Sequence, residues 1–78
     1  MISNKDLIEL LAKKAIAHLE YDDEHPDVGM GMFVGTAVTL AEQDVLEEAA
    51  RWNSLASLAL DFKSVRDDVI EVVRARRR

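Results

Sequence analysis

The sequence contains no cysteine, only two histidines and only one tryptophan. The lack of cysteine excludes disulfides, a thiolate zinc site and cysteine nucleophile chemistry, and it fits a reducing cytosol. Two histidines exclude a histidine-rich metal cluster, so any metal site would be built from carboxylates. We therefore expect no catalytic residues, no metal and no cofactor. Seventy-eight residues form at most one domain, in which the core is thin and a partner often supplies stability.

Long hydrophobic runs are also missing. The longest stretch without a charged residue, 28–41, has 14 residues, whereas a membrane-spanning helix needs about 20. The first residues lack the basic start, apolar run and small-residue cleavage site of a signal peptide. We expect a cytoplasmic protein without membrane contact.

Positive charge is scarce except at the C-terminus. The net charge is −5, but residues 74–78 carry +4, so the remaining chain carries −9. Nucleic acid would be repelled by this acidic body, and only the tail could bind phosphates. Its candidate contacts are Arg74, Arg76, Arg77 and Arg78. Alternatively, these cations interact favourably with the C-terminal end of a helix dipole and need no ligand.

The first third of the chain has a helical pattern of apolar residues. Over residues 4–21 the apolar positions recur every three or four residues, and Ser3 or Asn4 can cap the start. Pro26 and clustered carboxylates predict an acidic loop over 22–27. The apolar segment 28–38 is rich in glycine and methionine, and we expect irregular or short helical structure there.

The rest of the chain predicts helix as well. Thr39 and Glu42 form a capping-box pattern, which predicts a helix that starts at about Leu40. Its first stripe contains Ala41, Val45 and Ala49. A heptad seam follows over residues 55–72. Residues 40–75 could form one long helix or two helices broken near 53–54.

These patterns predict an all-α fold, a small bundle of three to four helices with a long C-terminal amphipathic helix. A helix that long cannot bury its whole stripe against a first helix half its length, so we expect homodimerisation to complete the bundle. The predicted interface residues are Trp52, Leu55, Leu58, Phe62, Val65, Val69 and Met32. Met30, Met32 and Phe33 form a soft apolar cluster that either binds a partner or closes the core.

The expected function is therefore that of a small accessory or regulatory protein, such as a bacterium or phage makes, that binds itself or another protein through helices. The first alternative is a nucleic-acid-associated protein that uses the arginine tail.

The second alternative is an enzyme, which depends on acids one turn apart. Asp44 precedes Glu47 by three residues, next to Glu48, and Asp68 likewise precedes Glu71. This spacing resembles the acidic metal motif of all-α nucleotide pyrophosphohydrolases of the MazG type, which implies Mg²⁺-dependent hydrolysis if Asp44, Glu48 and Asp68 converge. The chain departs from that family in lacking its basic nucleotide pocket.

Overall fold

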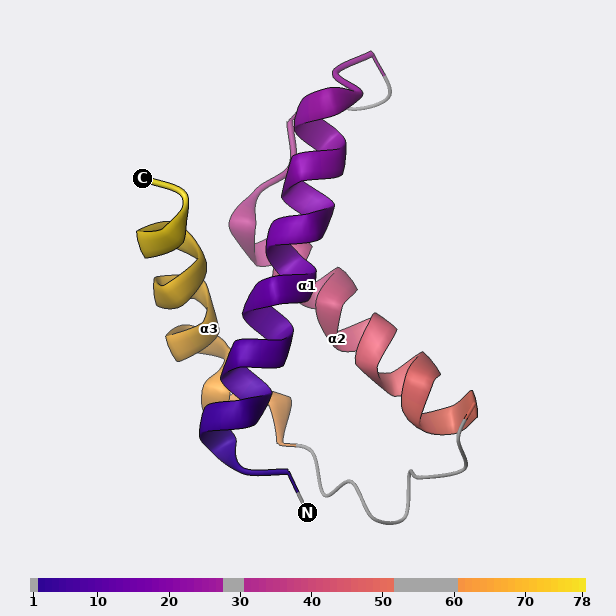
Figure 1. Cartoon of the computed structure of the whole chain (residues 1–78), viewed down its shortest axis with the longest axis vertical. Coiled ribbons are helices and arrows are strands. Elements are labelled where there is room, and N and C mark those ends of the chain that lie inside the picture. The colour runs from indigo at the N-terminus through magenta and orange to yellow at the C-terminus, as the bar shows by residue number, and fades with distance from the viewer. Residues whose placement is uncertain (1, 28–30, 52–60) are drawn as a thin grey trace.

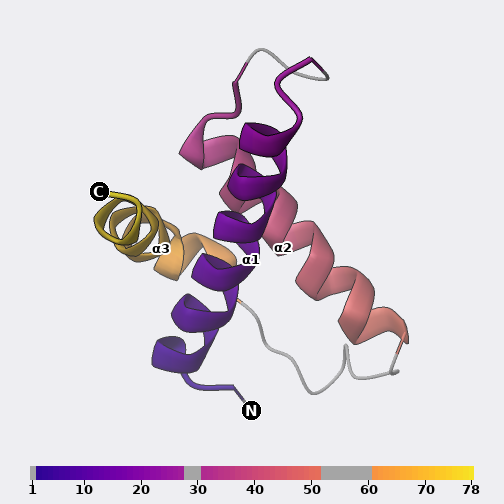
Figure 2. The ribbon, with the colours of Figure 1, turned by 45° about the horizontal axis from the view of Figure 1, so that its top comes forward.

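The computed structural model describes residues 2–27, 31–51 and 61–78. They form three helices, α1 (Asn4–Glu24), α2 (Val34–Arg51) and α3 (Phe62–Arg76), and no strand occurs among them. Helix α1 lies in the middle, with α2 crossing it on one side and the shorter α3 on the other (Figures 1 and 2). The expectation of an all-α fold is confirmed. Within these ranges no helix is long and apolar enough to cross a membrane.

Helix α1 begins where the sequence predicts and ends later. The Ser3 side chain accepts a hydrogen bond from the Asp6 N–H at 3.2 Å, which caps the helix. The buried residues Leu7, Leu11 and Leu19 belong to the predicted apolar stripe. The helix continues to Glu24, so the prediction of a loop from residue 22 is wrong. Proline disfavours helical geometry only at the residue before it, which leaves the acidic residues free to be helical.

Helix α2 corrects the capping-box prediction. It starts at Val34, five residues before Thr39, so Thr39 and Glu42 lie inside the helix rather than at its start. The Thr39 hydroxyl donates a hydrogen bond to the Gly35 carbonyl oxygen, one turn earlier, at 3.1 Å. The predicted stripe of Ala41, Val45 and Ala49 is buried, as expected.

Helix α3 has its own cap, which divides the C-terminal region. The Asp61 carboxylate accepts a hydrogen bond from the Ser64 N–H at 3.2 Å, and the Ser64 hydroxyl donates to the Asp61 carbonyl oxygen at 2.9 Å. Asp61 lies outside any helix, so residues 40–75 do not form one continuous helix. The predicted break near 53–54 falls outside the described residues.

The core is built mainly from small side chains on all three helices. The largest of the fully buried side chains are Leu11, Val38, Val65, Val69 and Val73, and alanines fill much of the remaining buried surface. Short side chains let helices approach closely, so the core is tightly packed but thin. Its stability therefore depends on a few aliphatic groups.

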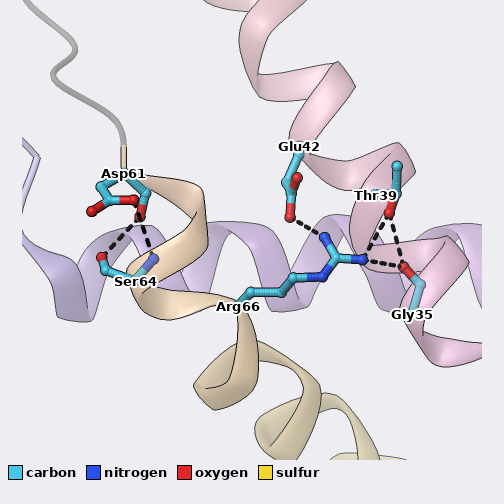
Figure 3. A network of polar contacts seen from close by, with 6 residues as sticks. All are labelled: Gly35, Thr39, Glu42, Asp61, Ser64 and Arg66. Atoms are coloured by element: carbon cyan, nitrogen blue, oxygen red, sulfur yellow. Dashed lines mark hydrogen bonds and ion pairs between the residues drawn. The ribbon is translucent and has the colours of Figure 1, made fainter.

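One arginine joins α3 to the first turns of α2 (Figure 3). The Arg66 guanidinium pairs with the Glu42 carboxylate and donates hydrogen bonds to the Gly35 carbonyl oxygen at 2.9 Å and to the Thr39 hydroxyl at 2.8 Å. All three acceptors lie on one face of α2, four and three residues apart. Arg66 thus fixes where α3 docks on α2, and it uses both side chains of the predicted capping box.

Candidate interaction surface

Two aromatic side chains project into solvent where α1 ends and α2 begins. Phe33 is 81% exposed and Tyr21 is 59% exposed, the largest such values among the big apolar side chains that the structure describes. Met32 stands beside Phe33 in the segment that leads into α2 and is half-buried against the core. We call Tyr21, Met32 and Phe33 the aromatic end.

Hydrogen bonds hold the aromatic end in place. The Met32 N–H donates to the Asp22 carboxylate at 2.7 Å, which ties the segment before α2 to the last turn of α1. The Phe33 carbonyl oxygen accepts from the Ala37 N–H at 3.0 Å. The Tyr21 ring stacks on the His25 imidazole, with centroids 4.1 Å apart. The exposed rings therefore stand on fixed backbone rather than on a free loop.

Sequence reasoning found this surface only in part. Met32 was among the predicted interface residues, and Phe33 belonged to the soft apolar cluster. Tyr21 was missed because its neighbours in the sequence are acidic. The exposure of the Tyr21 side chain depends on where α1 ends, which local periodicity does not specify.

The predicted interface on the C-terminal seam is largely accounted for inside the chain. Val65 and Val69 are only 2% and 0% exposed, and Phe62 is half-buried against the same core. The expectation that Val65 and Val69 need a second copy is corrected, since α3 packs against α1 and α2, which cover both side chains within one chain. Trp52, Leu55 and Leu58 lie outside the described residues.

The four arginines of the tail fall into two groups, one with ion-pair partners on α1 and one without a partner among the described residues. Arg76 pairs with Glu9 and Arg77 pairs with Asp23, the latter at 2.7 Å, so both bind acids of α1. The hydrogen bond from Arg76 holds the pKa of Glu9 below its ordinary value, and the pKa of Arg76 is raised by the same contact. In the described part of the chain, Arg74 and Arg78 have no ion-pair partner and line a shallow hollow with Glu71 and Ala75.

Two of the three candidate metal ligands, Asp44 and Glu48, pair with basic side chains of α1 instead. The Asp44 carboxylate lies 2.6 Å from His18 Nε2, and one turn away the Glu48 carboxylate lies 2.9 Å from Lys14 Nζ. These two pairs connect α1 and α2, which run antiparallel. Nowhere in 2–27, 31–51 and 61–78 do three His, Asp or Glu side chains meet as a metal site would require. Asp44, Glu48 and Asp68 thus do not converge.

Comparisons with known proteins add no relative. No family model matches the chain, and neither the curated proteins nor the solved structures gave a match.

Proposed function

We propose that this chain is a non-enzymatic interaction protein that binds a partner protein through the aromatic end. The single observation that carries this proposal is the position of Phe33, whose ring is 81% exposed while the core side chains are almost completely buried. Leaving a large apolar side chain in water forgoes about 1.5–3 kcal/mol of burial. Aromatic side chains are enriched among the residues that contribute most to protein interfaces, where a partner recovers this energy.

The rigidity of the aromatic end supports the same proposal. Backbone hydrogen bonds at Met32 and Phe33 join the surface to both helices, so little conformational entropy is lost when a partner binds. The pairing of Asp44 with His18 and of Glu48 with Lys14 supports a structural use of these acids rather than catalysis.

A second copy of the chain is one candidate partner. With Val65 and Val69 covered in the single chain, a homodimer would bury the aromatic end instead of the heptad seam. The fourth helix that the sequence allows would add surface to such an assembly. Sedimentation across micromolar concentrations separates self-association from binding of another protein.

The test compares the proteins captured by the natural chain with those captured by two variants. Phe33→Ser removes the exposed ring, and Leu46→Ser is its control, because Leu46 is an exposed apolar residue of α2, 43% exposed and more than three turns away. The proposal expects a partner that both the natural chain and Leu46→Ser retain and that Phe33→Ser loses. Equal capture by all three baits contradicts it.

Binding of nucleic acid by the tail is the second candidate. Arg74 and Arg78 favour it, since both are exposed and without an ion-pair partner in the described part of the chain. It ranks lower because α1 holds Arg76 and Arg77, and two free arginines on an acidic protein give a small electrostatic footprint.

A further inference from the structure

The aromatic end carries a marked negative charge. Exposed carboxylates flank Tyr21 along the last turn of α1 and the residues after it, at Glu20, Asp23, Glu24 and Asp27. Of these four, Asp23 has a basic partner, and the other three have none among the residues that the structure describes. The hydrogen bond between the Met32 N–H and the Asp22 carboxylate holds Phe33 close to this acidic turn. Exposed aromatic side chains next to unpaired carboxylates are complementary to a segment that combines apolar and basic side chains.

One arginine of the chain already reaches this end. Arg77 Nη2 lies 2.7 Å from the Asp23 carboxylate, although the two residues are 54 positions apart in the sequence. The contact brings the C-terminal end of α3 to the last turn of α1. It shows that a guanidinium group can reach a carboxylate of the last turn of α1, which also carries Tyr21.

Aromatic rings favour arginine in particular. A guanidinium group stacks on an aromatic face while it donates hydrogen bonds to carboxylates, which lysine does less well. Among the described residues Tyr21 stacks on His25, and no ring of those residues stacks on Phe33. Phe33, at 81% exposure, thus offers an open ring face, and the bond from Met32 to Asp22 keeps this residue near the acidic last turn of α1.

We propose that the aromatic end binds an arginine-rich segment of a partner protein, and that Arg77 occupies part of this surface and competes with that segment. This inference rests on the proposed function and names the chemistry of the partner. Loss of the Arg77 contact leaves the Asp23 carboxylate without a cation, so the partner segment gains a carboxylate when it displaces the tail. The tail thereby lowers the affinity of the surface for weakly basic segments.

The probe is a fluorescein-labelled peptide of alternating arginine and leucine, titrated with the full chain at low salt. Fluorescence anisotropy is expected to show binding that weakens as salt is added, because the contact is partly ionic. Phe33→Ser should weaken binding. The double variant Glu24→Gln/Asp27→Asn should weaken it more than Glu47→Gln/Asp67→Asn, which removes two exposed acids elsewhere on the molecule.

Competition by the tail gives the sharpest outcome. Arg77→Gln should bind the peptide about two- to fivefold more tightly than Arg74→Gln, which removes the same charge from a residue without an ion-pair partner in the described chain. Equal affinities of these two variants overturn the competition. Equal effects of the two acid double variants overturn the assignment of the site.

The peptide result can be separated from the proposed function. If the peptide does not bind but Phe33→Ser still loses its captured partner, the arginine-rich chemistry is wrong and the interaction function stands. If neither happens, both fail. Self-association that disappears in Arg77→Gln and Phe33→Ser would identify the occupant as the tail of a second copy, which also overturns the proposal of a different partner.

Discussion

The guanidinium of Arg66 donates a hydrogen bond to the carbonyl oxygen of Gly35, with 2.9 Å between the two atoms. This contact joins the second turn of α3 to the first turn of α2, and the following two turns of α2 carry the other two acceptors of Arg66, Thr39 and Glu42 (Figure 3). These acceptors lie in the first half of α2, the helix that Phe33 directly precedes. The position of α3 and the stability of the aromatic end are thus linked through one side chain.

Replacement of Arg66 by methionine should destabilise the chain by about 1–3 kcal/mol, because Glu42 keeps its charge in a half-buried position without its partner. Urea denaturation followed by circular dichroism measures the loss. Arg74→Met is the control, since Arg74 is exposed and has no ion-pair partner among the described residues. Equal stability of the two variants would show that the network contributes nothing.

Replacement of Val69 by alanine tests whether the seam is core or interface. Val69 is 0% exposed within one chain, so the loss of two methyl groups should cost about 2 kcal/mol through lost burial and a small cavity. Thermal unfolding at several protein concentrations should give the same loss each time. Val72→Ala, at a half-buried position, should cost less. A loss for Val69→Ala that varies with concentration would place Val69 at a subunit interface.

The ion pair between Glu9 and Arg76 should make stability depend on acid. The hydrogen bond from Arg76 lowers the pKa of Glu9 below 4.5, so the pair stabilises the folded chain above that pH and the effect is lost as the pH falls through the lowered value. Glu9→Gln should therefore lose less stability than the natural chain between pH 6 and 3. Glu20→Gln, at an exposed position of α1 without a basic partner in the described chain, should behave like the natural chain.

A direct titration checks the cause of that pH dependence. Carboxyl carbon resonances followed by NMR should give Glu9 a pKa below its ordinary value, which returns to that value in Arg76→Gln. A Glu9 pKa that does not respond to Arg76→Gln would contradict the ion pair.

The tail should bind nucleic acid weakly. With Arg76 and Arg77 held by α1, the double variant Arg74→Gln/Arg78→Gln should elute from immobilised duplex DNA with the natural chain, at or below about 100 mM salt. Retention of the natural chain at higher salt, lost in this double variant, would establish the nucleic-acid alternative. The variant leaves both contacts to α1 intact, so the result does not depend on folding.

Local periodicity predicted the parts of the fold that depend on neighbouring residues. The apolar stripe of α1, with Leu7, Leu11 and Leu19, is buried as predicted, and so are Ala41 and Val45 of α2. A helical wheel identifies which face is apolar, since that depends only on spacing. It does not identify what covers the face. The seam at Val65 and Val69 was therefore predicted correctly as apolar and assigned to the wrong covering surface.

The errors came from contacts between distant residues. Thr39 and Glu42 have the spacing of a capping box, but Arg66 binds both of them from the third helix, and the helix begins earlier. Likewise, Asp44 and Glu48 have a spacing seen in metal motifs, yet His18 and Lys14 pair with them across the helix interface. Such partners follow from the register of α1 against α2, which no local pattern specifies.

Site-specific photo-crosslinking in cells of the source organism tests whether a partner protein binds at the aromatic end. A benzophenone amino acid at position 33 replaces one exposed aromatic ring by another, and the same group at position 46 serves as the control. Position 33 should crosslink to a distinct partner protein, and position 46 should not. Equal crosslinking from both positions, or none from position 33, would contradict the claim that the aromatic end is the binding surface.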